Sequence, residues 1–275
     1  MVSYNEKKKK LLGLIDEYAK QDVAVAFSGG VDSSLLLKIV CEATKKWQTK
    51  VYAVTMHTKL HPMKDVEIAK KVAAEVGAEH EILYVDELAH AGIENNPENR
   101  CYLCKKFLFT RAKEVAEQKG VTLILDGTNE DDLHQYRPGI QALKELGVSS
   151  PIAAAGMTKE EVRKLAKEYE ISVSNRPSTP CMATRFPYGD ALSYEKMNQL
   201  EEGEEYLREK GFYNVRLRLH GDILRVEVDE ESMKELLSIK KEVTTYLKQL
   251  GFLYITLDLE GFRSGSMDIK ITKES

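Results

Sequence analysis

A glycine- and serine-rich segment near the N-terminus, residues 28–34 (Ser-Gly-Gly-Val-Asp-Ser-Ser), most constrains what this chain can fold into. The apolar run before it, residues 23–27, predicts a buried strand. The apolar pattern after it, residues 35–47, predicts an amphipathic helix. Glycines let the backbone come close to an anion, and the unpaired N–H groups of a first helical turn point toward the same place. The segment therefore predicts a phosphate-binding turn between a strand and a helix.

The spacing within this segment distinguishes it from the commonest phosphate-binding loops. The chain contains no Gly-Lys pair, which excludes the P-loop, and the segment does not fit Gly-x-Gly-x-x-Gly. It resembles the pyrophosphate loop (PP-loop) of ATP pyrophosphatases, which cleave ATP between the α- and β-phosphates. A carboxylate beside phosphate needs a metal partner, so Asp32 is expected to act catalytically through Mg²⁺. The ATP-binding candidates in the loop are Ser28, Gly29, Gly30, Asp32, Ser33 and Ser34. An ordinary Gly-Gly turn with a Ser/Asp helix cap is the simpler alternative.

Composition narrows the class of protein. The chain has 275 residues, of which 43% are hydrophobic, so it can build one large core or two smaller ones. A net charge of −4 and a pI near 6.0 argue against a nucleic-acid-binding surface as the main feature. The apolar run after the lysines at 7–10 is too short for a signal peptide, and no apolar stretch approaches membrane length. We therefore expect a cytoplasmic protein without a membrane segment, whose cysteines do not form structural disulfides.

Strand-like and helix-like segments alternate through the first part of the chain. Charged helices end in a glycine and lead into apolar runs at five places: Gly77, Gly120, Gly147, Gly211 and Gly251. Strands are predicted at residues 22–27, 50–56, 79–85 and 121–126, with a helix at 62–76. This order predicts an α/β fold, a parallel sheet covered by helices on both faces.

The C-terminal part of the chain has a different order of predicted elements. A segment with three prolines, residues 174–189, excludes a regular helix and marks a domain boundary. A helix, a hairpin, a helix and a strand follow, at residues 193–210, 215–228, 231–250 and 252–259. We therefore predict an N-terminal α/β domain (1–170), a cysteine-bearing connecting segment (171–192) and a smaller α+β domain (193–275).

In a parallel sheet, ligands bind outside the carboxyl ends of the strands. Three segments should meet there: the loop at 28–34, residues 55–57 after the second strand, and residues 126–129 after the fourth. Met56 and Gly127 are therefore further candidates for ATP binding. The polar side chains at 126–129 suit ligand contacts, although a plain turn explains them equally well.

Three of the four cysteines stand in positions suited to chemistry. Cys101 and Cys104 lie at a predicted helix start, on one face of one turn, and Cys181 lies in the proline-marked segment. A lone Cys-x-x-Cys can be a redox pair or half of a zinc site, and three thiolates also match three ligands of a [4Fe-4S] cluster. We take the cluster as the leading interpretation and thiol or persulfide chemistry as the second. Cys41, within the apolar helix, is predicted to pack in the core.

The predicted hairpin carries two arginines on one face, Arg216 and Arg218, with Arg225 and Glu227 on the facing strand. Paired arginines suit a phosphate or a carboxylate. A solvated outer sheet face with Arg–Glu pairs is the alternative that the pattern alone slightly favours. Two further segments are candidate anion sites of low specificity: Gly261-Phe262-Arg263-Ser264-Gly265 and Tyr136-Arg137-Pro138-Gly139.

These motifs occur in an order that resembles the LarE family of ATP-dependent sulfur transferases over nearly the whole chain. The resemblance rests on the PP-loop, residues 126–127 and 136–139, the segment from Cys181 to Arg-Phe-Pro-Tyr-Gly at 185–189, the hairpin at 215–228 and residues 261–265. It implies a Rossmann-like PP-loop domain, of the adenine nucleotide alpha hydrolase type. It also implies adenylation of a pyridinium carboxylate mononucleotide with release of pyrophosphate, followed by sulfur insertion, in the biosynthesis of a nickel-pincer cofactor.

The resemblance also implies roles for individual residues. In one branch of the family a cysteine at the position of Cys181 gives up its own sulfur. Because Cys101 and Cys104 are also present, this chain is similar to the branch in which three cysteines hold a [4Fe-4S] cluster that carries the sulfide, with Cys181 still catalytic. Substrate-binding candidates carried over in this way are Arg185, Arg216, Arg218, Arg263, Glu204 and Glu227. A homo-oligomer, such as a hexamer, is also implied.

Two other functions remain open from the sequence. A PP-loop enzyme that thiolates tRNA can also use Cys-x-x-Cys with a third cysteine, but it needs a broad basic surface that the acidic pI argues against. A non-catalytic nucleotide-binding regulator would need the PP-loop alone.

Overall fold

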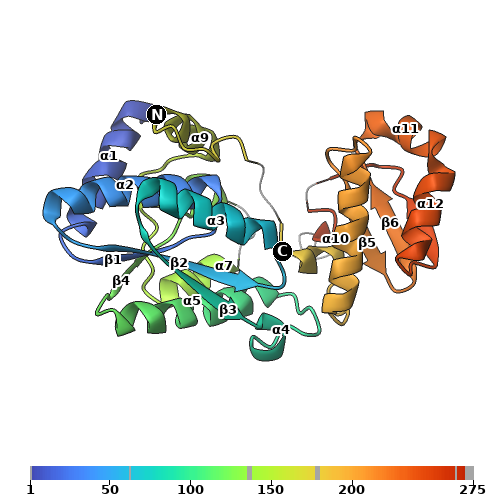
Figure 1. Cartoon of the computed structure of the whole chain (residues 1–275), viewed down its shortest axis with the longest axis horizontal. Helices are drawn as coiled ribbons and strands as arrows, with labels where there is room; N and C mark the ends of the chain where they lie inside the picture. The colour runs from blue at the N-terminus through green and yellow to red at the C-terminus, as the bar shows by residue number, and fades with distance from the viewer. Residues whose placement is uncertain (1, 62, 135–137, 177–179, 264, 270–275) are drawn as a thin grey trace. The chain divides into compact units, whose positions relative to one another are not determined.

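The computed structural model describes residues 2–61, 63–134, 138–176, 180–263 and 265–269. It divides into two compact units, and Figure 1 colours their elements by residue number. The first comprises residues 1–92 and 99–179, and the second comprises residues 93–98 and 180–275. The expected connecting segment at 171–192 is thus shared between the units, and the short stretch 93–98 joins the second one.

The first unit is built on a four-stranded parallel sheet. Its strands are β1 (Val23–Ala26), β2 (Val51–Thr58), β3 (Glu79–Val85) and β4 (Leu123–Leu125). Their order in space is β3-β2-β1-β4, and each neighbouring pair runs parallel. Ser149 adds an isolated parallel bridge to Leu125 beyond the last strand. The predicted α/β fold with a parallel sheet is confirmed.

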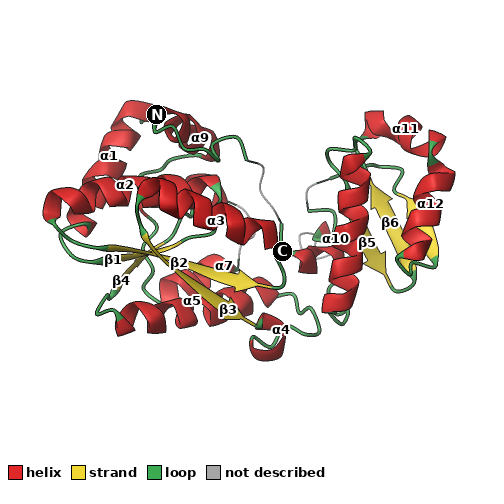
Figure 2. Ribbon diagram, viewed as in Figure 1, coloured by secondary structure: helices red, strands yellow, loops and turns green. Residues whose placement is uncertain are grey.

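Helices cover both faces of this sheet (Figure 2). On one face lie α1 (Tyr4–Tyr18), α2 (Val31–Trp47), α3 (Met63–Val76) and α9 (Lys159–Glu168), and on the other lie α5 (Arg100–Gln118) and α7 (Gly139–Glu145). The alternation of β1 produces this layering: Val23 and Val25 join the larger apolar core, while Ala24 joins the core under α5. Both cores are nearly free of solvent exposure, so the strands of this sheet carry apolar residues on both faces.

Short helices connect these elements. They are α4 (Glu87–His90), α6 (Glu130–Leu133) and α8 (Pro151–Ala154). The five glycines predicted to end helices all have positive φ, between +70° and +103°. A left-handed residue is what stops a helix and turns the chain toward the next element, and glycine adopts it without a steric cost.

The second unit is a three-stranded sheet with helices. The helix α10 (Tyr194–Glu209) precedes β5 (Arg216–His220) and β6 (Ile223–Glu227), which form the predicted antiparallel hairpin around Gly221. β7 (Tyr254–Leu257) then pairs parallel with β6. The single helix predicted at 231–250 is wrong, because the chain forms a 3₁₀ turn (Glu230–Ser232), α11 (Met233–Ser238) and α12 (Lys240–Gln249). Ile239, at φ −104° and ψ 16°, interrupts the helix where neither glycine nor proline marks a break.

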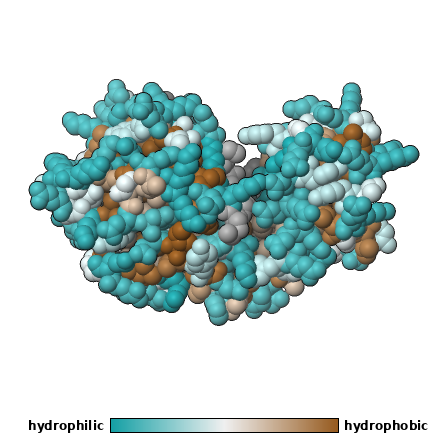
Figure 3. All heavy atoms as spheres, in the orientation of Figure 1, coloured by the Kyte–Doolittle hydropathy of each residue, from teal (hydrophilic) through white to brown (hydrophobic). Residues whose placement is uncertain are grey.

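Hydrophilic side chains cover most of the face drawn in Figure 3, and hydrophobic ones form smaller patches. Within the described residues, no helix is both long enough and apolar enough to span a bilayer.

Candidate functional site

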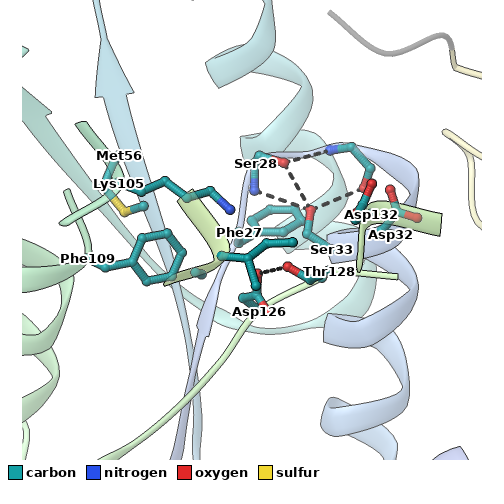
Figure 4. Close-up of a pocket in the computed structure, with 14 residues that line it drawn as sticks. Phe27, Ser28, Asp32, Ser33, Met56, Lys105, Phe109, Asp126, Thr128 and Asp132 are labelled. Atoms are coloured by element: carbon teal, nitrogen blue, oxygen red, sulfur yellow. Dashed lines mark hydrogen bonds between the residues drawn. The ribbon is translucent and has the colours of Figure 1, made fainter. Parts of the chain in front are cut away.

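A cavity lies in the first unit at the carboxyl ends of the parallel strands, beside the start of α2 (Figure 4). The three segments that the sequence predicted to meet all contribute to its wall. The loop supplies Ser28, Gly30, Asp32 and Ser33, the second strand supplies Met56, and the fourth strand's end supplies Asp126, Gly127 and Thr128. Gly29 and Ser34 belong to the loop but do not line the cavity. Ser34 is buried, and no described residue hydrogen-bonds its hydroxyl.

Serine hydroxyls hold the loop in shape. Ser33 Oγ accepts a hydrogen bond from the Ser28 N–H at 3.3 Å and donates to the Gly30 carbonyl at 3.2 Å. The two serine oxygens lie 3.2 Å apart. Gly30 precedes α2 and offers no capping side chain to it. The N–H groups of the first turn therefore point out of the helix toward the cavity, where the positive end of the helix favours an anion.

Gly127 lets the end of β4 touch the start of α2. A Cβ atom at this position would lie 2.8 Å from the Ser33 amide nitrogen and 3.2 Å from the Asp32 carbonyl carbon. Both neighbours are backbone atoms, which cannot move aside as a flexible side chain can. Gly29, with φ +69°, similarly brings the loop against the backbone of Ala69 in α3. These two contacts fix the loop between the sheet and α3.

Asp32 is held by partners from two other segments. Its carboxylate pairs with the ammonium of Lys159, at the start of α9, and accepts a hydrogen bond from the Asn129 amide at 3.3 Å. Neither partner is near Asp32 in the sequence, so only the fold brings the three together. Asn129 confirms that the polar segment at 126–129 makes contact with the loop.

The carboxylates of the cavity suit a magnesium–nucleotide complex. Asp32, Asp126 and Asp132 all line the cavity, and carboxylate oxygens are ligands that Mg²⁺ prefers. Both oxygens of Asp126 accept hydrogen bonds from hydroxyls, those of Thr128 and Ser150. Both oxygens of Asp32 are engaged as well, one by the Asn129 amide and the other by the Lys159 ammonium.

Sequence reasoning missed four residues of the cavity wall: Lys105 and Phe109 on α5, Asp132 on α6 and Ile140 on α7. The Lys105 side chain extends toward the loop, and its ammonium lies 5.8 Å from the centre of the Phe109 ring (Figure 4). A signal was present, because Cys101, Lys105 and Phe109 follow at intervals of four residues and so share one helix face. In this helix, only Cys101 and Cys104 were predicted to take part in chemistry.

Arg176 also supports the loop and was not singled out from the sequence. Its guanidinium donates to the Gly29 carbonyl at 3.1 Å and pairs with the Asp65 carboxylate of α3. Arg163 in turn donates to the Arg176 carbonyl at 2.9 Å. No motif marks Arg176, because its contact partners lie more than a hundred residues away.

The cysteines lie in both units. Cys101 and Cys104 stand in the first two turns of α5 as predicted, and Cys181 belongs to the second unit, directly before the 3₁₀ turn at Met182–Arg185. Cys41 is buried in the core, where desolvation raises the pKa of its thiol to about 11, which confirms its structural interpretation. Across the described residues, no set of three or more His, Cys, Asp or Glu side chains is grouped as a metal site.

In the second unit, Glu204 of α10 is the centre of a buried ion-pair network. Its two carboxylate oxygens accept from Arg185 Nε and Nη2, both at 2.8 Å, and from Arg208 at 2.7 Å. The Leu217 backbone N–H adds a bond at 3.1 Å. Arg185 also donates to the Cys181 carbonyl at 3.4 Å, so this network fixes the backbone at the cysteine. Burial raises the pKa of Glu204, but the Arg185 charge and the hydrogen bonds outweigh it and lower that pKa overall.

Glu227 of β6 is the centre of a second network. It is fully buried and accepts from Arg218 at 3.1 Å, Arg225 at 2.8 Å and the Ser266 hydroxyl at 2.8 Å. The Arg–Glu pairs of the alternative that the pattern slightly favoured are therefore present, but its solvated sheet face is wrong, because Arg218 is only 5% exposed. The polar face of this strand is covered by the 3₁₀ turn and by a C-terminal segment, since Arg218 donates to the Thr184 carbonyl at 2.9 Å and Ser266 bonds Glu227. The alternating pattern of a strand does not reveal such a cover.

Arg263 and Arg216 differ in their pairing. Arg263 bonds the carboxylates of Glu260 and Asp258. Arg216 has no carboxylate in ion-pair contact among the described residues; it donates to the Val215 carbonyl at 2.7 Å and lies 5.2 Å above the Phe262 ring. Desolvation lowers its pKa to about 10, so it stays a cation at neutral pH. The candidates Tyr136, Arg137 and Ser264 lie outside the described residues.

The chain is similar in sequence to proteins of known families. A family model described as a PP-loop domain matches residues 3–136. The chain is 36% identical over 273 residues to pyridinium-3,5-bisthiocarboxylic acid mononucleotide synthase of Lactiplantibacillus plantarum, covering 99% of this chain and 98% of that protein. It is 37% identical over 268 residues to an uncharacterised protein of Synechocystis sp., covering 96% and 98%. A tRNA-specific 2-thiouridylase of Rickettsia bellii is 26% identical, covering 66% of this chain and 59% of that protein.

The Gly127→Ala substitution is expected to weaken ATP binding. The added Cβ would press on the Ser33 and Asp32 backbone, and overpacking of this kind costs about 1–3 kcal/mol. If the loop shifts to relieve this strain and must be restored when ATP binds, the same cost lowers the affinity about 5- to 150-fold. Calorimetric titration with ATP measures the change. Gly13→Ala on exposed α1 is the control, because nothing lies within 4 Å of its added Cβ. Equal affinities in the two variants would contradict the importance of this contact.

The Glu204→Gln substitution is expected to destabilise the protein by about 3–5 kcal/mol, because it leaves the buried Arg185 without its counter-charge. Urea unfolding followed by circular dichroism measures the loss. Glu209→Gln, at the exposed end of the same helix, should change stability by less than about 0.5 kcal/mol.

The pH dependence provides a second measurement of the same pair. The pKa of Glu204 is lowered in the folded protein, so its contribution is fully present above the ordinary glutamate pKa and is lost as the pH falls through the lowered value. The difference in stability between wild type and Glu204→Gln should therefore shrink under acidic conditions. A difference that does not change with pH would show that lost packing, not lost charge, is responsible.

Proposed function

Because the chain belongs to the LarE family of ATP-dependent sulfur transferases in the PP-loop superfamily, we propose that it converts a carboxylate of a pyridinium mononucleotide into a thiocarboxylate. The observation that carries the proposal is similarity over both units, not over the PP-loop alone. The relative from L. plantarum is named for a bisthiocarboxylic acid mononucleotide product. The proposed role is accordingly in nickel-pincer cofactor biosynthesis.

The first unit supplies the activation step. ATP would lie with its base against the apolar wall near Met56 and Phe109 and its phosphates along the loop toward Asp32. A substrate carboxylate oxygen attacks the α-phosphorus, the bond to the bridging oxygen breaks, and pyrophosphate leaves. The helix N-terminus and the Lys105 ammonium stabilise the charge that develops on the phosphates. The product is an acyl adenylate, in which AMP is now a good leaving group.

The second step replaces oxygen by sulfur. Sulfide attacks the carbonyl carbon of the adenylate, the carbon–oxygen bond to AMP breaks, and the thiocarboxylate remains. We propose that Cys101, Cys104 and Cys181 hold a [4Fe-4S] cluster, which would supply a transferable sulfide when bound. The three thiols are the right kind of ligand, and two of them share one face of α5. This cluster assignment distinguishes the chain from family members that consume their own cysteine.

The second unit supplies the anion-binding groups for the substrate. Arg216 supports this role most directly, since it is a half-buried cation without a carboxylate partner among the described residues. Arg218 lies beside it on β5, and Arg185, Glu204, Glu227 and Arg263 belong to the networks that hold the arginines in place. The proposal includes a cytoplasmic location and a homo-oligomeric assembly such as a hexamer.

Exchange of labelled pyrophosphate into ATP tests the activation step. With a pyridinium carboxylate mononucleotide present, wild type should catalyse exchange, and Asp32→Ala should abolish it because the metal-binding carboxylate is lost. Asp16→Ala, which breaks a surface Asp–Lys pair in the same unit, should leave the rate unchanged. Absence of exchange in wild type would indicate a non-catalytic nucleotide-binding regulator. Exchange that requires tRNA would instead indicate a tRNA-thiolating enzyme.

Iron and acid-labile sulfide content after anaerobic purification tests the cluster. Wild type should be brown and contain both, and Cys101→Ala, Cys104→Ala and Cys181→Ala should each lose most of the colour. Cys41→Ala is the matched control, because this thiol is buried in the core and should not affect iron content. Colourless, iron-free wild type after anaerobic reconstitution would overturn the cluster assignment and leave the adenylation proposal intact.

A further inference from the structure

Lys159 is not among the site residues predicted from the sequence, yet its ammonium contacts the loop at residues 28–34. It is the first residue of α9, and it pairs with the Asp32 carboxylate across 127 positions of sequence. The Lys159 side chain is 33% exposed and that of Asp32 is 19% exposed, so the pair is partly shielded from water. Opposite charges attract more strongly where they are partly shielded from water than on the open surface.

The backbone around Lys159 is firmly anchored. Thr158 caps α9 in a reciprocal arrangement with Glu161, and the Lys159 N–H donates to the Asp131 carboxylate at 2.7 Å. Lys7 of α1 pairs with Glu161 at 2.9 Å and holds the same turn. The Lys159 N–H is thus already used, so any ligand contact must come from the ammonium. A long, flexible side chain on a fixed Cα can move its charge by several ångströms without moving the helix.

The position of the Lys159–Asp32 pair relative to the cavity determines which part of a bound nucleotide the Lys159 ammonium can reach. In Figure 4, Met56 and Phe109 lie at one side of the cavity, and Asp32 and Asp132 lie at the other, beyond Ser33. A nucleotide with its base at the apolar side would extend its phosphates toward Asp32. The Lys105 side chain extends into the space between these sides (Figure 4). Lys159 does not line the cavity itself, but its ammonium pairs with the Asp32 carboxylate at the far side.

We propose that Lys159 binds the β- and γ-phosphates of ATP, and the pyrophosphate product, by exchanging its partner Asp32 for phosphate oxygens. This inference rests on the proposed cleavage of ATP between the α- and β-phosphates. When Asp32 turns to the magnesium ion that accompanies the nucleotide, the ammonium loses its partner beside two anionic phosphates. The charge that neutralises Asp32 in the ligand-free chain then stabilises the leaving group.

Calorimetric titration of the full chain with MgATP, magnesium pyrophosphate and AMP tests this assignment. Lys159→Met should weaken binding of MgATP and pyrophosphate by about 10- to 100-fold, the effect of a lost charge-assisted hydrogen bond. AMP lacks the β- and γ-phosphates, so its affinity should stay within about twofold. Lys159→Arg should recover part of the loss. Lys167→Met, exposed on the same helix, should change nothing and controls for net charge.

A second comparison separates direct contact from an effect through Asp32. In an Asp32→Asn background the carboxylate is gone, so a lysine that only positions Asp32 has nothing left to position. Adding Lys159→Met to that background should still weaken pyrophosphate binding if the ammonium touches phosphate. No further loss, or an equal loss for AMP and ATP in the single variant, would overturn the proposal.

These binding measurements do not depend on sulfur transfer. If wild type showed no carboxylate-dependent pyrophosphate exchange, the proposed function would fail, yet the difference between ATP and AMP would still report on Lys159. If exchange occurred and Lys159→Met bound all three ligands normally, only the assignment of Lys159 would fail.

Discussion

The backbone contact between Gly127 and the first turn of α2 is the constraint on which the first unit depends. It brings the end of β4 within van der Waals distance of the loop, at a place where any side chain would meet backbone atoms. The outward-facing N–H groups of α2, the carboxylate of Asp126 and the lysine of α5 consequently share one cavity. In the reaction proposed above, the helix dipole, the metal-binding carboxylate of Asp32 and the Lys105 ammonium would act on the same phosphate chain, as transfer of an adenylyl group requires.

The second unit holds its arginines by different physical means. It buries two glutamates, Glu204 and Glu227, each shared by arginines from separate elements. Buried ion pairs add little net stability compared with apolar packing, but they hold guanidinium groups in fixed orientations. Arg216 is left beside these networks with its charge uncompensated by an adjacent carboxylate in the described part of the chain. Under the proposed function, the networks that stabilise this unit would also hold the arginine that binds the substrate.

The sequence predicted those features that local patterns encode. The strands of the sheet, the glycine helix ends, the position of Cys101 and Cys104 at a helix start and the burial of Cys41 all follow from periodicity or from single-residue conformational rules. The contacts of Arg176 with Gly29 and of Lys159 with Asp32 could not be predicted, because each joins residues more than a hundred positions apart. The burial of Arg218 was missed for a related reason: alternation along a strand defines its two faces but does not show what covers them.

The pair between Lys159 and Asp32 has a consequence for the order in which ligands arrive. In the ligand-free chain each group already has an opposite charge, so the loop needs no bound cation to offset the aspartate. Free magnesium must compete with the ammonium for the carboxylate, and free nucleotide must compete with the carboxylate for the ammonium. The magnesium–nucleotide complex satisfies both groups in a single event. The loop is thereby selective for the preassembled complex over either component alone, a form of cooperativity that needs no change in the fold.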